Sequence, residues 1–171
     1  KNELVLYNGV DTQKFYPENN KKANKLFTIG CIANFWPLKD QMTLIKATEI
    51  LIKEHQIALE VIFIGSGQTL NQCKEYVTHN QLSNVIIFRK EVPHDELRNF
   101  YKSLDLFVLP SYYEAFGCVY NEAYECGIPF IAVENQGISE IIQEDEKEKW
   151  LIPPKDSNQL AKLIMNQVKT Q

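Results

Sequence analysis

Six short apolar runs recur along the chain, and a segment with helical character follows each of them. The predicted strands span residues 26–32, 61–64, 85–88, 106–109, 130–133 and 150–152. The predicted helices span residues 42–53, 69–79, 93–104, 118–126, 139–143 and 157–168. Nearly continuous apolar strands that alternate with helices are typical of a parallel sheet covered on both faces. The sequence therefore predicts an α/β, Rossmann-like, doubly wound fold with six parallel strands.

Length and charge restrict the classes of partner. A chain of 171 residues suits one domain with a substantial core. Its formal net charge of -4 argues against a nucleic-acid-binding surface built on bulk positive charge. No apolar run approaches the roughly 20 residues that a membrane-spanning helix needs. We therefore expect no nucleic-acid partner and no membrane span in this sequence.

The cysteines and histidines do not form a pattern of metal ligands. The cysteines are Cys31, Cys73, Cys118 and Cys126, and the histidines are His55, His79 and His94. The cysteines lie in predicted strands and helices without a close Cys-x-x-Cys pair, so we interpret them as buried free thiols. The histidines are scattered among polar neighbours and are interpreted as surface residues. We expect no bound metal.

The loop after the fourth apolar run carries two carboxylates, Glu114 and Glu122, eight positions apart. A turn that contains Gly117 separates them and leads into the predicted helix at residues 118–126. A strand end that feeds a helix N-terminus is where α/β proteins bind anionic ligands, because the first N–H groups of a helix are free. Gly117 would let the main chain approach such a ligand closely.

Residues 1–25 do not fit the alternation. A short strand is predicted at residues 4–7 and a polar loop at residues 19–25, and the sequence starts without Met. We interpret residues 1–25 as a hinge segment from a missing N-terminal domain, and residues 26–171 as the domain proper. The charged run at residues 144–149 is expected to form a solvated loop.

Six ordered blocks of the chain together resemble the C-terminal domain of retaining glycosyltransferases of family 4, which have the GT-B fold. The blocks are residues 8–15, 32–47, 62–67, 85–111, 114–129 and 136–142. They include an Asn-Gly-Val-Asp segment at residue 8 and a Glu-x7-Glu motif from Glu114 to Glu122. The resemblance implies that the chain is one half of a GT-B fold and binds a nucleotide-sugar donor.

The resemblance also implies roles for three charged side chains. Glu122 would hold the ribose, because a carboxylate can accept two hydrogen bonds from vicinal hydroxyls. Glu114 would contact the donor sugar near the reacting carbon, where it could offset positive charge in the transition state. Lys39 would neutralise the diphosphate as a point charge. Glu114 and Lys39 are thus the expected catalytic residues.

Further donor contacts follow from the same resemblance. The expected donor-binding residues besides Glu122 are Ala115, Phe116, Gly117, Cys118, Val119, Asn34, Gly65 and Lys90. Asn34 stands where the family usually has Arg, which removes a bidentate phosphate partner. Asp40 stands where the family has Gly after the Lys.

The expected function is the donor-binding half of a retaining glycosyltransferase that transfers a glycosyl group from an NDP-sugar to an acceptor, with no cofactor. The acceptor-binding N-terminal domain would be absent, so the fragment alone would bind donor but be inactive. We expect a cytoplasmic protein, with contact to the inner face of the membrane left to the absent half. Another GT-B enzyme, such as a sugar-nucleotide epimerase or a sugar-phosphate synthase, and a non-enzymatic nucleotide-binding module remain alternatives.

Overall fold

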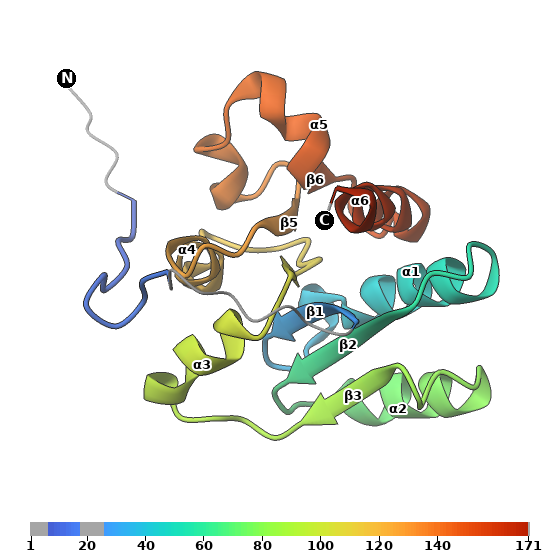
Figure 1. The fold of residues 1–171 in the computed structure, drawn as a ribbon. Coiled ribbons are helices and arrows are strands. Elements are labelled where there is room, and N and C mark those ends of the chain that lie inside the picture. The colour runs from blue at the N-terminus through green and yellow to red at the C-terminus, as the bar shows by residue number, and fades with distance from the viewer. Residues whose placement is uncertain (1–6, 18–25, 171) are drawn as a thin grey trace.

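A computed structural model describes residues 7–17 and 26–170 and shows one six-stranded parallel sheet (Figure 1). The strands are β1 (Phe27–Ile32), β2 (Leu59–Ile64), β3 (Ile86–Arg89), β4 (Leu106–Val108), β5 (Phe130–Val133) and β6 (Leu151–Ile152). Their order is β3-β2-β1-β4-β5-β6, so the direction of winding reverses between β1 and β4. This reversal defines a doubly wound sheet and confirms the predicted fold.

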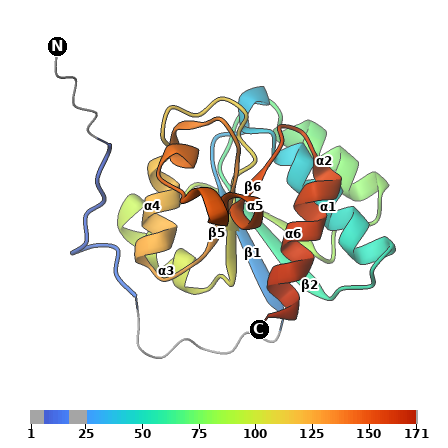
Figure 2. The same cartoon turned by 90° about the horizontal axis from the view of Figure 1, so that it is seen from above.

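Helices cover both faces of the sheet. They are α1 (Gln41–Lys53), α2 (Leu70–His79), α3 (Leu97–Lys102), α4 (Cys118–Glu125), α5 (Lys147–Trp150) and α6 (Ser157–Lys169). Within the described residues, four 3-10 turns accompany these helices: η1 (Pro37–Lys39), η2 (His94–Glu96), η3 (Gly137–Glu140) and η4 (Glu144–Glu146). The view from above shows α1, α2 and α6 on one side of the sheet and α3 and α4 on the other (Figure 2). Among the described residues, no helix is long and apolar enough to cross a membrane.

The central strands are buried along most of their length, which explains their continuous apolar sequence. In β1 the first five residues are buried, and in β2 only Glu60 is partly exposed. Ile29 of β1 pairs with Val61 on one side and with Leu106 on the other. Because helices cover both faces of the sheet, these strands have little contact with solvent on either face, and most of their side chains are apolar.

Two expectations near the C-terminal end were wrong. The predicted helix at residues 139–143 is instead the 3-10 turn η3, which ends at Glu140. The predicted loop at residues 144–149 is helical, because η4 leads directly into α5. Ion pairs at i,i+3 spacing stabilise these turns, with Lys147 Nζ 2.6 Å from Glu144 and Lys149 Nζ 2.6 Å from Glu146.

The N-terminal segment, here residues 7–17, packs beside α3 and α4. The main-chain N–H of Phe15 donates to the carbonyl of Asp11 at 2.9 Å, and this turn directs the Phe15 ring inward, where it is 2 % exposed. Asn121 Nδ2 of α4 donates to the carbonyl of Asn8 at 3.1 Å. Of the strand predicted at residues 4–7, only Tyr7 lies within the described residues, and it is not in a strand. The hinge role of residues 1–25 stays a prediction.

Candidate functional site

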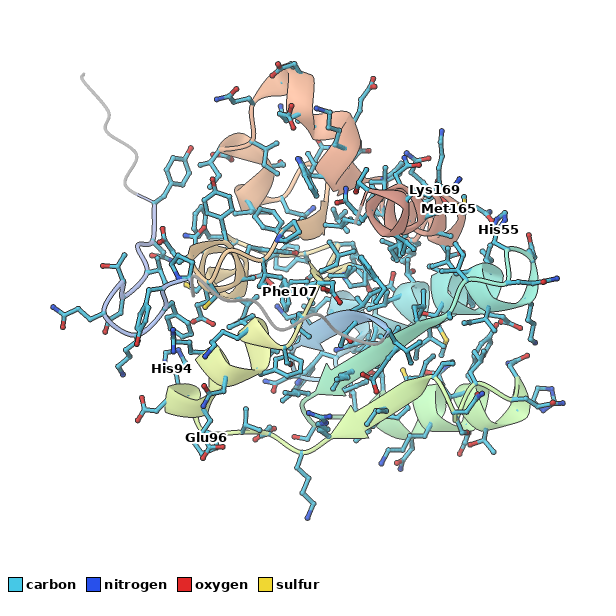
Figure 3. All side chains as sticks on the ribbon, viewed as in Figure 1. His55, His94, Glu96, Phe107, Met165 and Lys169 are labelled. Carbon is cyan, nitrogen blue, oxygen red and sulfur yellow. The ribbon has the colours of Figure 1, made fainter. Side chains whose placement is uncertain are left out.

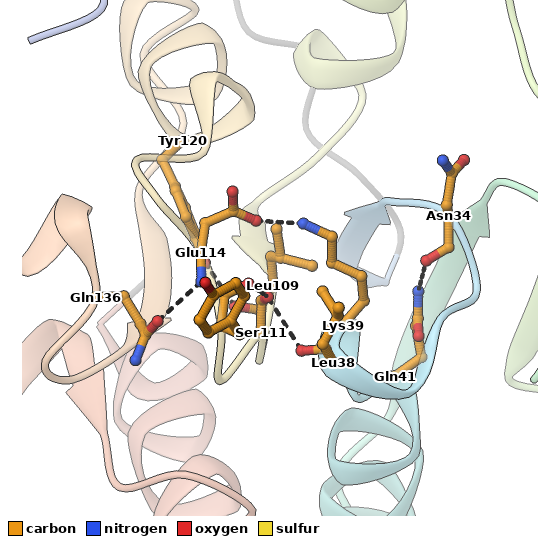
Figure 4. Close-up of polar contacts among 10 residues, drawn as sticks. Asn34, Leu38, Lys39, Gln41, Leu109, Ser111, Glu114, Tyr120 and Gln136 are labelled. Carbon is orange, nitrogen blue, oxygen red and sulfur yellow. Dashed lines mark hydrogen bonds and ion pairs between the residues drawn. The ribbon is translucent and has the colours of Figure 1, made fainter.

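The loops that follow β1 and β4 meet at the carboxyl edge of the sheet, where the strand order reverses (Figure 4). The main-chain N–H of Tyr112 donates to the carbonyl of Leu38 at 3.1 Å, and Ser111 Oγ donates to the same carbonyl at 3.1 Å. Ser111 is fully buried, so water does not compete for its hydroxyl. The two loops are therefore fixed to each other at the position where doubly wound folds bind ligands.

Lys39 and Glu114 form an ion pair across these two loops (Figure 4). The side chains are 22 % and 15 % exposed, so solvent screens the pair only partly. Lys39 ends η1, and Asp40 then adopts a left-handed conformation, φ 48° and ψ 43°, before α1 begins. Sequence analysis assigned both side chains to one site, and the structure brings them into contact.

The main chain of Glu114 is held by the loop after β5. Its N–H donates to Gln136 Oε1 at 2.8 Å, and the N–H of Gly137 donates to its carbonyl at 3.3 Å. A Cβ built on Gly137 would lie 1.7 Å from the carbonyl oxygen of Ala115, so only glycine fits there. Sequence analysis gave no role to Gln136 or Gly137, because nothing in their residue types indicates this contact.

The segment from Ala115 to Val119 leads into α4 and forms its first two residues. Phe116 is 6 % exposed, and Gly117 is the N-cap with a φ of 76°. Ala115 and Cys118 are exposed, and Val119 is half-buried. The interpretation of Cys118 as a buried thiol was therefore wrong, whereas the other three cysteines are buried. The first residue of a helix that starts at a strand edge has few neighbours, which explains its exposure.

Three predicted donor contacts lie farther along the same edge. Asn34 is exposed, and its carbonyl accepts a hydrogen bond from Gln41 Nε2 at 3.1 Å (Figure 4). Gly65 is buried with a φ of 143°, and a Cβ there would lie 2.1 Å from the carbonyl oxygen of Ala33. Contact between the loops after β1 and β2 is thus enough to require this glycine. Lys90 is exposed after β3, two strands away from β1 in the sheet.

Glu122 is buried, at 7 % exposure, on the side of α4 that faces α3 and η2. Its Oε2 accepts a hydrogen bond from the hydroxyl of Tyr101 at 2.8 Å, and its Oε1 lies 3.1 Å from His94 Nε2. Burial, followed by the charge of Glu122, raises the pKa of Tyr101 far above its usual value, so its hydroxyl stays a donor. A carboxylate buried to this degree needs such donors.

Sequence analysis missed both partners of Glu122. His94 was interpreted as a surface residue, and its side chain is indeed 54 % exposed, but its ring nitrogen faces Glu122. Figure 3 shows His94 beside the N-terminal segment. Tyr101 lies in the helix predicted at residues 93–104, and its ring is fully buried. Only the packing of α3 against α4 reveals what its hydroxyl contacts.

A separate groove of about 970 Å³ lies between α5 and α6. It is lined by polar and charged side chains, among them Glu134, Lys147, Asp156 and Lys162. None of the residues that sequence analysis assigned to a site lines this groove. Within the described residues, no three His, Cys, Asp or Glu side chains gather as they would around a metal ion.

Comparisons with known proteins identify relatives of this chain. A D-inositol 3-phosphate glycosyltransferase of Paenarthrobacter aurescens is 32% identical over 146 residues, which is 80% of this chain and 36% of that protein. An Escherichia coli protein, UDP-Gal:alpha-D-GlcNAc-diphosphoundecaprenol alpha-1,3-galactosyltransferase, is 29% identical over 167 residues, covering 89% of this chain and 41% of its own length. The chain thus spans about two fifths of the length of these relatives.

Solved structures match nearly the whole of this chain. The C-terminal domain of a group 1 glycosyl transferase, LpcC of Francisella tularensis, superposes with a TM-score of 0.81 and 27% identity, covering 94% of this chain and 88% of that one. Anabaena HepE in complex with UDP-glucose gives a TM-score of 0.83 at 23% identity, over 98% of this chain and 48% of that one. The latter likeness shows the fold alone.

The family model for glycosyl transferases group 1 matches residues 12–171, which is nearly the whole chain. The chain therefore belongs to the group 1 glycosyltransferases and corresponds to the C-terminal half of their GT-B fold.

Proposed function

We propose that this chain is the donor-binding domain of a retaining glycosyltransferase that uses an NDP-sugar. The observation that carries the proposal is the contact between Lys39 and Glu114 at the edge where β1 and β4 end. A cation, a carboxylate and a helix N-terminus meet there, and a sugar diphosphate offers a matching partner to each of them.

Lys39 would hold the diphosphate of the donor together with the start of α4. A phosphate oxygen would compete with Glu114 for the Lys39 ammonium group, because both are anionic acceptors. Donor binding would therefore release the Glu114 carboxylate, which could then accept hydrogen bonds from hydroxyls of the sugar. The ion pair thus holds each side chain in place through the other.

Glu122 would bind the ribose. A carboxylate has about four acceptor positions, and Tyr101 and His94 take one on each oxygen. The remaining positions suffice for two vicinal hydroxyls. Ala115, Phe116, Gly117, Cys118 and Val119 would line the sugar and diphosphate, while Asn34, Gly65 and Lys90 would lie along the nucleotide.

The transfer itself would proceed on the front face of the sugar. The bond between the anomeric carbon and the diphosphate oxygen breaks, and the leaving diphosphate accepts the proton of the acceptor hydroxyl that attacks from the same side. Lys39 and the α4 N-terminus would stabilise the charge on the leaving group, and Glu114 the positive charge on the sugar. The acceptor would be bound by an N-terminal domain that the relatives' additional length accommodates, joined through residues 1–25.

The names of the relatives favour uridine nucleotides as first probes, because one relative acts on UDP-Gal and a structure with the same fold contains UDP-glucose. The test is titration calorimetry of this chain with UDP, GDP, ADP and their glucose conjugates. Glu122→Ala is expected to weaken binding by roughly 1–3 kcal/mol. Glu125→Ala, on the same helix, is the control and should bind as the wild type does. If none of these nucleotides binds, the proposed function is wrong.

A further inference from the structure

The carboxylate of Glu122 is held by groups from two elements other than its own helix. Tyr101 comes from α3 and contacts Oε2, whereas His94 opens η2 and contacts Oε1. Each oxygen thus has its own partner, so rotation about the last side-chain bond would break both contacts. These two contacts therefore fix the orientation of this buried carboxylate.

Phe15 of the N-terminal segment supports both of these partners. Its ring meets the His94 ring edge to face with centroids 5.3 Å apart, and the Tyr101 ring edge to face at 6.0 Å. Phe15 itself is 2 % exposed, so it occupies a fixed position against both rings. The charged neighbours Lys14 and Asp95 pair with each other at 3.1 Å, and both are at least half exposed.

We propose that Tyr101 and His94 are positioning residues that give this site its preference for ribose. The proposal rests on the function proposed above, in which Glu122 binds the ribose. With one acceptor position on each oxygen already filled, the carboxylate offers its remaining positions in one fixed direction. Two vicinal hydroxyls fill such a pair of positions, and a nucleotide without them leaves the positions empty. Preorganisation of this kind strengthens binding because the carboxylate has no freedom left to lose.

Loss of either partner should affect the ribose and leave the rest of the nucleotide unchanged. Without the Tyr101 hydroxyl, the buried Oε2 of Glu122 lacks a hydrogen-bond donor, and the carboxylate rotates toward a different donor. The ribose hydroxyls then meet a misdirected acceptor. The diphosphate, which depends on Lys39 and the α4 start, keeps its partners.

The experiment compares dissociation constants of this chain for UDP, ADP and GDP with those for the 2′,3′-dideoxy forms of the same nucleotides. The wild type should prefer the ribose form of the nucleotide that it binds by about tenfold or more, the value of one or two hydrogen bonds to a charged group. Tyr101→Phe and His94→Ala should each reduce this preference about fivefold or more, with the affinity for the dideoxy form unchanged. His94→Gln keeps an N–H donor and should retain most of the preference.

Tyr76→Phe is the matched control. The Tyr76 hydroxyl also donates to a carboxylate, Glu49 Oε2, at 2.7 Å, but it does so between α2 and α1. Tyr76→Phe removes the same hydroxyl oxygen from the same kind of contact as Tyr101→Phe does. It should leave the preference for the ribose form at the wild-type value.

The outcomes separate this proposal from the proposed function. If Tyr101→Phe and His94→Ala weaken ribose and dideoxy forms equally, the two residues serve stability and the positioning proposal is wrong. If the wild type binds nucleotides without preferring ribose, the positioning proposal fails while the diphosphate site stands. If the wild type binds no nucleotide, both fail. Should Tyr101→Phe not fold, the half-exposed His94 decides the question alone.

Discussion

Gly137 offers the sharpest test of how closely the loops after β4 and β5 are packed. In Gly137→Ala the new methyl group would start 1.7 Å from the carbonyl oxygen of Ala115, and 3.0 Å from Cα of Phe116. Both are main-chain atoms, so no flexible side chain can move aside. The two loops would have to separate by roughly 1.5 Å before the contact becomes sterically allowed.

The same movement would strain the hydrogen bonds that hold Glu114. Its N–H donates to Gln136 Oε1 at 2.8 Å, and its carbonyl accepts from Gly137 N at 3.3 Å. Overpacking of this kind costs about 1–3 kcal/mol of unfolding free energy. For a chain of this length the melting temperature should fall by about 2–12 °C. Because the main chain of Ala115 and Phe116, which would line the sugar and diphosphate, is displaced as well, nucleotide affinity should also fall about tenfold.

The measurement is thermal unfolding followed by calorimetry with the nucleotide that the wild type binds. Gly9→Ala is the control, because a methyl group at Gly9 meets nothing within 4 Å. Gly9→Ala adds the same methyl group and should leave the melting temperature and the nucleotide affinity near their wild-type values. If Gly137→Ala melts and binds as Gly9→Ala does, the loops are not in the close contact described above, and the support of Glu114 by residues 136–137 must be abandoned.

Three further predictions concern the same edge of the sheet. Lys39→Ala should weaken nucleoside diphosphate binding about 10- to 100-fold and leave nucleoside binding unchanged, which titration of UDP against uridine, and of the ADP and GDP pairs, would measure. Burial raises the pKa of the Asp40 carboxyl, so Asp40→Asn should raise the melting temperature at pH 7. Iodoacetamide should modify the exposed Cys118 before the buried Cys31, and a bound nucleotide should slow this reaction.

The pH dependence of the Asp40 variant follows from linkage. A carboxyl whose pKa is raised by folding binds its proton more tightly in the folded chain, so the charged form weakens the fold at pH values above that raised pKa. The gain from Asp40→Asn should therefore be complete at neutral pH and vanish below the ordinary pKa of Asp. A gain that is independent of pH would show that burial of the charge is not the cause.

For Cys118, equal labelling with and without nucleotide would place it outside the site.

The fold could be predicted because its strands are buried on both faces. A strand such as β2, with five of its six residues buried, has a continuous apolar sequence that differs from both an exposed strand and an amphipathic helix. The short helix α5 could not be predicted in this way. Four residues are too few to show a helical period, and its stability depends on ion pairs and on Trp150 Nε1 donating to Glu146 at 3.2 Å.

The meeting of Lys39 and Glu114 was also predictable, since parallel strands bring their following loops to one edge. The presence of Asp at position 40 is explained by the backbone conformation there. Its left-handed conformation is one that Gly adopts freely and Asp tolerates better than most residues, so Asp can occupy the position where the family has Gly. A residue type that departs from a family pattern can thus satisfy the same backbone requirement.

The partners of Glu122 show where sequence reasoning stopped and how it could go further. Tyr101 lies on the same helical face as Leu97 and Phe100, so its spacing alone indicates core packing. A buried phenol nevertheless needs an acceptor, and a buried carboxylate needs donors. Because α3 packs on α4, a tyrosine on the buried face of one and a glutamate on the buried face of the other can satisfy both requirements together. Matching such needs between the two helices pairs Tyr101 with Glu122 once the packing of α3 on α4 is known.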